Sequence, residues 1–308
     1  MNTPPIAPDD DAAYLGGNQQ KDLYAAMPEK LSSSPALSPP AVRHHLRRPV
    51  LIGMVNWVGL WTLYSREVLR FTKIALQTLV APMITSVLFL MVFSVAVGDR
   101  ASFAGNVDFT TFLIPGLVMM SVLQNAFANT STSLVVSKVQ GNIVDLLMPP
   151  LGPGELLVGL ALAGMTRGFC VGVVTAATLM LIGGITVPTD IGIAVLFLIL
   201  GSFVMSFAGI LAGIWATKFD GLAAITNFVI QPLTFLSGTF YSIDRLPAPF
   251  DSIAGYNPVF YAIDGFRYGM IGLADRPLLV GIGGLLAVNL VLGLLCYKAL
   301  HSGYRLKS

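Results

Sequence analysis

The sequence predicts an all-α integral membrane protein with six transmembrane helices, and three observations support this. Of the 308 residues, 55% are hydrophobic and 11% are charged, and the mean hydropathy is +0.75, whereas a typical soluble domain carries about 25% charged residues. Apolar runs near the roughly 20 residues that a transmembrane helix needs recur along the chain. Basic residues are unevenly divided between the connections of these runs. The expected spans lie near 74–97, 109–133, 157–183, 190–216, 222–240 and 277–297.

Residues 1–50 precede the transmembrane domain, which we expect to occupy residues 51–308. They are rich in Pro, Ser, Asp and Ala and lack apolar periodicity, which is typical of a disordered tail. The apolar runs begin late, and no cleavage site follows the first. We therefore expect a cytoplasmic tail and no signal peptide.

Residues 54–73 predict an amphipathic helix at the membrane interface. Trp57 and Trp61 recur at helical spacing with other apolar residues, and Arg66, Glu67 and Arg70 supply charge. Aromatic rings beside a basic flank suit a helix that lies in the headgroup layer and contacts lipids. The alternative is a plain lead-in to the first span.

The polar stretch Lys138–Glu155 interrupts the apolar pattern after the second expected span. Its apolar residues recur at helical spacing, and Pro149 and Pro150 end the pattern because proline lacks the backbone N–H. We expect a short amphipathic helix, which either docks a partner that moves the spans or only joins them. The residues concerned are Lys138, Val139, Asn142, Ile143, Asp145, Leu146 and Leu147.

A few polar residues fall inside the expected spans. A charge such as that of Arg167, in the third span, is costly there unless it pairs, snorkels or faces water. Arg167 therefore lines a path, clamps helices together or snorkels to the interface. In the second span, Gln124, Asn125 and Asn129 either hydrogen-bond between helices or line a polar path.

Residues 241–276 are too numerous for a simple connection and too polar for a span. Asn257 suits a helix N-cap with Pro258 in the first turn. Tyr261 belongs to a set of aromatic residues that keep the segment near lipid, and Asp264 and Arg267 are three apart, so they can pair on one helix face. We expect a pair of short re-entrant helices before the last span.

The basic residues predict the orientation. With the N-terminus inside, thirteen of the 18 Lys and Arg residues lie in inner segments and four in outer ones, with Arg167 inside a span. This distribution obeys the positive-inside rule, so both termini and the Lys138–Glu155 stretch are expected to be cytoplasmic.

Several functions find no support in the composition. No lysine follows the glycine pattern of a phosphate-binding loop, and the three histidines lack metal-ligand partners nearby. The two cysteines lie in apolar runs, where inert core residues are expected. The net charge of +2 gives no indication of nucleic-acid binding. We therefore expect no metal and no cofactor on this chain.

The local strings, in this order, resemble the membrane subunit of an ABC-2 type transporter. They are Glu67–Val68–Leu69–Arg70, Phe112–Leu113–Ile114–Pro115–Gly116, Asp145–Leu146–Leu147–Met148–Pro149–Pro150–Leu151, Gly159 with Arg167–Gly168, Asn257–Pro258–Val259–Phe260–Tyr261 and Gly265–Phe266–Arg267. The resemblance runs from about Trp57 to Tyr297 and is silent on the tail. It implies a homodimer or a heterodimer of permeases, of which we expect the homodimer, bound to two cytoplasmic ATP-binding cassette subunits that carry the ATP and Mg²⁺. It makes the Lys138–Pro150 stretch a coupling helix and places the re-entrant segment over the outer half of the path.

We therefore expect a non-catalytic permease of a bacterial inner-membrane exporter, which moves a (lipo)polysaccharide, a lipid or a drug-like molecule. An ion-coupled secondary transporter is the alternative, but no span carries an acidic residue in its middle, where such carriers often keep one. A membrane enzyme would need a catalytic pair, and no Ser–Lys, paired Asp or His cluster is visible in the sequence.

Overall fold

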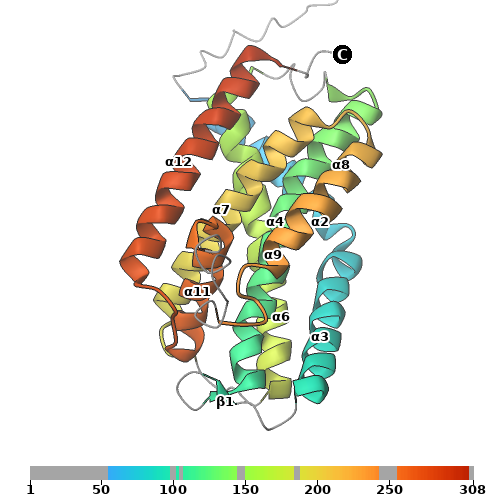
Figure 1. Cartoon of the computed structure of the whole chain (residues 1–308). Coiled ribbons are helices and arrows are strands. Elements are labelled where there is room, and N and C mark those ends of the chain that lie inside the picture. The colour runs from blue at the N-terminus through green and yellow to red at the C-terminus, as the bar shows by residue number, and fades with distance from the viewer. Residues whose placement is uncertain are drawn as a thin grey trace, which may run out of the picture. The chain divides into compact units, whose positions relative to one another are not determined.

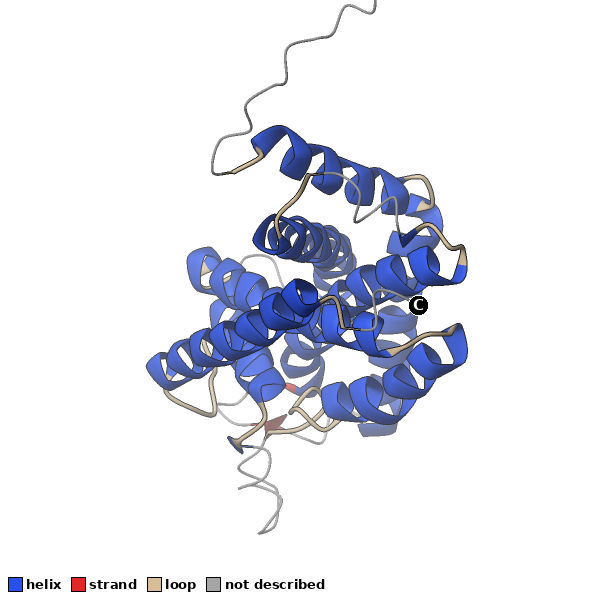
Figure 2. Ribbon diagram, turned by 90° about the horizontal axis from the view of Figure 1, so that it is seen from above, coloured by secondary structure: helices blue, strands red, loops and turns tan. Residues whose placement is uncertain are grey.

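The computed structural model describes residues 55–97, 102–103, 107–143, 150–183, 188–242 and 255–304. The predicted tail, residues 1–50, lies outside these ranges, as do Asp145, Leu146 and Leu147. The regular structure of the described chain is helical apart from one pair of two-residue strands, β1 (Ser102–Phe103) and β2 (Val107–Asp108), which pair antiparallel and are drawn red in Figure 2. The helices are α2 (Trp57–Thr72), the π-helix η2 (Leu76–Val80), α3 (Ala81–Val97), α4 (Phe109–Val139), α6 (Pro153–Gly183), α7 (Ile191–Trp215), α8 (Phe219–Ile225), the π-helix η4 (Thr226–Ile230), α9 (Gln231–Phe235), α11 (Pro258–Ile271) and α12 (Leu278–Ser302).

Five helical stretches in the described ranges are long and apolar enough to cross a membrane. They are Leu76–Ala96, Phe109–Val139, Pro153–Gly183, Ile191–Trp215 and Leu278–Ser302, and each coincides with an expected span. The expected span near 222–240 instead contains three short consecutive helices, α8, η4 and α9. The structure thus confirms a helical protein with several apolar spans.

Helix α4 forms the centre of the bundle. It packs against α6 and α7, and most of its residues are buried, whereas the first span and α12 are largely uncovered. Small residues bring these helices close together, as they do in many membrane bundles. A Cβ atom added to Gly209 of α7 would lie 2.2 Å from the hydroxyl of Thr130 on α4, which itself donates to the Ser206 carbonyl at 2.9 Å.

Helices α3 and α12 lie at opposite sides of the bundle in Figure 1, with α4, α6 and α7 between them. Both leave much of their apolar surface uncovered. Water would disfavour such an exposed apolar surface, whereas lipid tails accept it. The large apolar side chains exposed on these two helices are Ile84, Leu88, Met91, Val92, Val95, Leu279, Val280, Leu286, Leu290, Val291, Leu294, Leu295 and Tyr297.

The segment before the last span contains α11, which is buried rather than exposed. Asn257 caps its first turn by accepting from the Val259 N–H at 3.0 Å, and Pro258 occupies the first turn, as predicted. Gly272 ends the helix with a φ of 74°, which favours glycine. Helix α11 packs against α7, α4 and α12. Residues 243–254, where a second short helix was expected, are outside the described part of the chain.

Candidate functional site

The stretch from Lys138, expected to be a separate coupling helix, begins as the end of α4. Lys138 and Val139 form the last turn of α4, and the chain then turns through Gly141, whose φ of 73° favours glycine. The Lys138 ammonium donates to the carbonyls of Gly213 at 2.9 Å and Ile214 at 2.6 Å, where α7 ends. A cation at the carbonyl end of a helix is favourable because it satisfies unpaired acceptors. Lys138 therefore joins the ends of α4 and α7.

The next residues of this stretch differ in exposure. The side chain of Val139 is 50% exposed and Asn142 is exposed, whereas Ile143 is 8% exposed. Ile143 packs in a small apolar cluster with residues of α2 and α6, including Leu63 and Leu157. The single helix expected from Lys138 onward is thus interrupted by a turn at residues 140–142, because Gly141 adopts a conformation outside the helical region. The spacing of the apolar residues did not indicate this turn, since it continues unchanged across the glycine.

The beginning of α2 is tied to the beginning of α6. The Asn56 side chain caps α2 by accepting from the Gly59 N–H at 2.9 Å. Its backbone N–H donates to a carboxylate oxygen of Glu155, and its side-chain amide donates to the Pro150 carbonyl at 3.3 Å. The other Glu155 oxygen accepts from the Gly152 N–H at 2.7 Å. The predicted interfacial helix and the stretch before α6 therefore form one connected structure.

Two tryptophans of α2 remain uncovered by the protein. Trp57 is 72% exposed and Trp61 is 67% exposed. Both line an apolar groove of about 340 Å³ between α2 and α6. Beside this groove, the Tyr64 hydroxyl lies 3.0 Å from that of Thr166. The exposed rings fit the predicted interfacial role of this helix.

The charged residues of α2 form a buried connection to the bundle. Glu67 is 1% exposed and pairs with Arg70 at 2.9 Å and with Arg66 at 3.4 Å. Arg70 also donates to the backbone and side-chain oxygens of Asn129, at 2.8 and 3.2 Å. The sequence placed these charges on the polar side of an amphipathic helix. In the structure α2 packs against α6, and Arg70 links it to α4 through Asn129.

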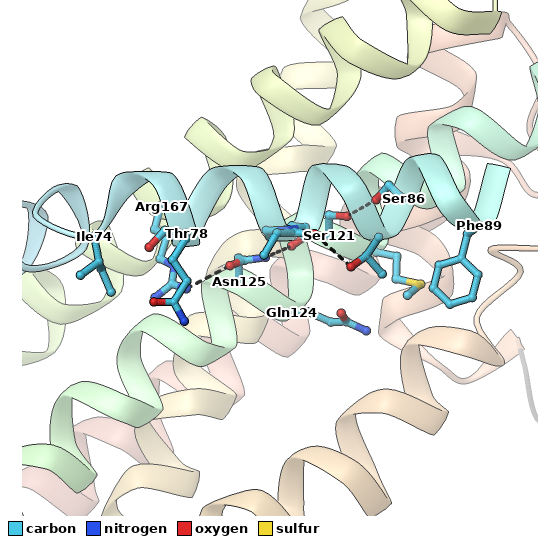
Figure 3. Close-up of a pocket in the computed structure, with 13 residues that line it drawn as sticks. Ile74, Thr78, Ser86, Phe89, Ser121, Gln124, Asn125 and Arg167 are labelled. Carbon is cyan, nitrogen blue, oxygen red and sulfur yellow. Dashed lines mark hydrogen bonds between the residues drawn. The ribbon is translucent and has the colours of Figure 1, made fainter. Parts of the chain in front are cut away.

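Three of the polar residues expected within the spans share one pocket. Gln124, Asn125 and Arg167 line a space of about 370 Å³ together with residues of η2 and α3 (Figure 3). Arg167 donates to the Asn125 side-chain oxygen at 3.1 Å, and the Asn125 amide donates to the Ser121 carbonyl at 3.0 Å. The pocket therefore lies between the first three spans.

The pocket also contains polar residues that no sequence pattern indicates. Ser86 of α3 and Ser121 of α4 lie 2.8 Å apart, and Gln124 donates to the Thr234 hydroxyl of α9 at 3.1 Å. Single Ser and Thr residues in apolar runs carry no periodic signal, because their hydroxyls can be satisfied within their own helix. Their contribution becomes visible only when the helices are packed.

Asp264 and Arg267 form the predicted pair, and both are buried in α11. Their side chains lie 3.9 Å apart, and the Asp264 carboxylate accepts from the backbone N–H groups of Asp275 at 2.8 Å and Arg276 at 3.1 Å. Arg267 donates to the Gly238 carbonyl and stands 4.0 Å above the Phe112 ring. Burial raises the pKa of Asp264 to about 6, although the N–H groups of Asp275 and Arg276 and the charge of Arg267 each lower it. The pair joins α11 to the segments on both sides of it and to α4.

Metal-binding groups are sparse in this protein. Within the described ranges, no three His, Cys, Asp or Glu residues are grouped as a metal ion would require. The chemical features of these sites are therefore hydrogen bonding, one unpaired guanidinium in the pocket and apolar surfaces.

The fold and these sites define a polytopic helical membrane protein with a half-open pocket that holds polar side chains and a structured face where α4 and α7 end and α2 and α6 begin. Comparison with known proteins makes the class more specific. The family model described as ABC-2 type transporter matches residues 58–271. The chain belongs to the ABC-2 type transporter family.

Individual relatives agree with this assignment. The chain is 36% identical over 252 residues to the inner membrane transport permease YadH of Escherichia coli strain K12, which covers 82% of this chain and 98% of the relative. It is 27% identical over 259 residues to nodulation protein J of Rhizobium leguminosarum bv. viciae, which covers 80% of this chain and 94% of the relative. The protein is thus a multi-pass inner-membrane permease of an ABC transporter, a transport subunit that works with a cytoplasmic ATP-binding subunit.

Proposed function

We propose that this permease is the membrane subunit of an exporter, in which a separate subunit binds ATP and Mg²⁺ and hydrolyses the ATP. The family match from residue 58 to residue 271 carries this proposal, because it covers the described chain from α2 to α11. The chain would supply the translocation path without catalysing bond chemistry. The cargo would be a (lipo)polysaccharide, a lipid or a drug-like molecule, as the resemblance to the family implies.

We further propose six spans per protomer and two identical protomers. The segment Phe219–Phe235, formed by α8, η4 and α9, would be the additional crossing. At 1.5 Å per residue its 17 residues reach about 26 Å, slightly less than the roughly 30 Å of a bilayer core. The uncovered apolar faces of α3 and α12 offer room for both lipid and a second protomer. Helix α11 would then be re-entrant on the outer side.

The proposed coupling face lies where α4 ends. Both termini would be cytoplasmic, and the ATP-binding subunit would contact the stretch from Asn142 through Asp145 to Leu147. Lys138 and Glu155 flank this stretch and connect it to α7 and to α2. A displacement of the stretch would therefore be transmitted to four helices rather than to one.

The experiment is to search the adjacent reading frames for an ATP-binding cassette protein, to purify it together with the chain and to reconstitute both in lipid vesicles. We expect a stable complex and ATP hydrolysis that requires the partner. Replacing the catalytic carboxylate of the partner should abolish hydrolysis and transport, while collapse of ion gradients should leave transport intact. If transport instead follows an ion gradient and needs no ATP-binding partner, the chain is an ion-coupled secondary carrier and the proposal is wrong.

A further inference from the structure

Arg167 carries its charge near the middle of a transmembrane helix. It lies 14 residues after the first residue of α6 and 16 before the last, which is about 21 and 24 Å from the two ends of the helix. A cation at such a position in a transmembrane helix is costly unless a counter-charge, a polar path or water compensates it. The side chain faces the pocket between α3, α4 and α6 (Figure 3).

The protein itself compensates this cation only in part. No carboxylate among the residues that the structure describes lies within 4.0 Å of Arg167. Its guanidinium donates one hydrogen bond, to Asn125, although it carries five N–H groups, and its Nε is buried without a partner. The neighbouring Arg70 adds positive charge and is itself paired with Glu67. A residue that only clamped helices together would be expected to have its donors satisfied.

The walls of the pocket favour an anion with an apolar part. Its lining contains no acidic residue, and apart from Arg167 its polar groups are the neutral amides and hydroxyls of residues such as Gln77, Gln124 and Ser121. The amides of Gln77 and Gln124 carry N–H groups that can donate hydrogen bonds to an oxyanion. Ile74, Pro82 and Phe89, from the first span, add an apolar wall. The volume of about 370 Å³ falls within the usual range of small-molecule sites.

We propose that this pocket binds the anionic group, a phosphate or a carboxylate, of an amphipathic molecule, with Arg167 as its counter-charge. This inference rests on the proposed function in one respect only, namely that the bound molecule is the exported cargo. It limits the cargo to molecules with an acidic headgroup and an apolar portion. Arg167 would contact the headgroup, and the first span would contact the apolar portion.

Binding can be measured on the purified full-length chain without ATP or a partner subunit. Native mass spectrometry of the protein released from a neutral detergent would count bound dodecyl phosphate, with dodecyl glucoside as the neutral probe. Phosphatidylglycerol and inorganic phosphate form two further arms, which distinguish a lipid headgroup from a free anion. The variants are Arg167→Gln, Arg167→Lys and, as a matched loss of charge at an exposed position on α12, Lys298→Gln.

We expect the wild type and Lys298→Gln to bind dodecyl phosphate roughly tenfold or more tightly than dodecyl glucoside, because a charge-assisted hydrogen bond is lost with the neutral probe. Arg167→Gln should lose this preference, and Arg167→Lys should keep part of it. Equal binding of the two dodecyl probes by the wild type, or an unchanged preference in Arg167→Gln, would overturn the inference. If the wild type binds no probe and Arg167→Gln has a different oligomeric mass from the wild type, Arg167 pairs between protein copies. That result would overturn the inference as well. Failure of ATP-driven transport alone would refute the proposed function and leave this site standing.

Discussion

The buried pair of α11 allows a quantitative prediction. Asp264 and Arg267 are 2% and 1% exposed and lie 3.9 Å apart, so their attraction is about 4 kcal/mol at an effective dielectric constant of 20. Removing one partner leaves the other charge buried, which typically costs about 3–5 kcal/mol. We therefore expect Asp264→Asn and Arg267→Met each to destabilise the protein by that amount. The double variant should cost about 2–3 kcal/mol less than the sum, since neither charge is then stranded.

The assay is reversible unfolding of the purified chain in mixed micelles with rising dodecyl sulfate, followed by circular dichroism. Asp220→Asn is the control, because Asp220 is exposed in the first turn of α8 and its loss should cost less than about 1 kcal/mol. If the two single effects add within about 0.5 kcal/mol, the side chains do not interact energetically and the reasoning fails. The elevated pKa of Asp264, about 6, indicates that burial already opposes its charge. A double variant that is only slightly less stable than the wild type would agree with this unfavourable effect of burying the charge.

Three further predictions concern the packing and the coupling face. Lys138→Met should destabilise the chain by about 1–3 kcal/mol in the same unfolding assay, because the α7 carbonyls lose their charged donor. Lys138→Arg should recover part of the lost stability. An unchanged unfolding midpoint for Lys138→Met would contradict the capping role. Gly269→Ala should cost about 1–3 kcal/mol, because a Cβ there would lie 2.4 Å from the Ala194 nitrogen, whereas Gly283→Ala, with nothing within 4 Å, should be neutral or slightly stabilising. Equal stabilities of these two alanine variants would argue against the close approach of α11 and α7. Asp145→Arg should weaken co-purification of the ATP-binding subunit without changing the expression of the permease, and full retention of that subunit would exclude a contact at Asp145.

Local signals in the sequence predicted much of this structure. The apolar runs located five spans, and the Asn257–Pro258 dipeptide correctly predicted the start of α11. The three-residue spacing of Asp264 and Arg267 correctly predicted their contact. In each case the partners lie within a few residues of one another, so helical geometry alone determines whether they meet.

Contacts between distant residues could not be predicted in this way. Lys138 contacts the end of α7 across 75 residues of sequence, and Arg167 contacts Asn125 across 42. Glu67 looks like a solvated charge on an amphipathic helix, yet it is buried because Arg70 reaches Asn129 on α4. Nothing in the spacing of these residues indicates the partner, since the partner depends on how the helices pack. This is why the pocket emerged only from the structure.

The two π-helices offer a physical reason why the first and fifth expected spans differ from the regular pattern. Each is followed two residues later by a proline: η2 ends at Val80 before Pro82, and η4 ends at Ile230 before Pro232. Proline removes one helical hydrogen bond and its ring clashes with the carbonyl four residues earlier, which lies inside each π-helix. The wider turn relieves that clash while the helix continues, and π-turns often accompany functional sites. Pro82 lines the polar pocket, and the α9 helix that contains Pro232 supplies Thr234, which binds Gln124 of that pocket. The wider turns therefore relieve the proline clash in two helical segments at the points where their polar residues meet those of α4, which regular helices would not do.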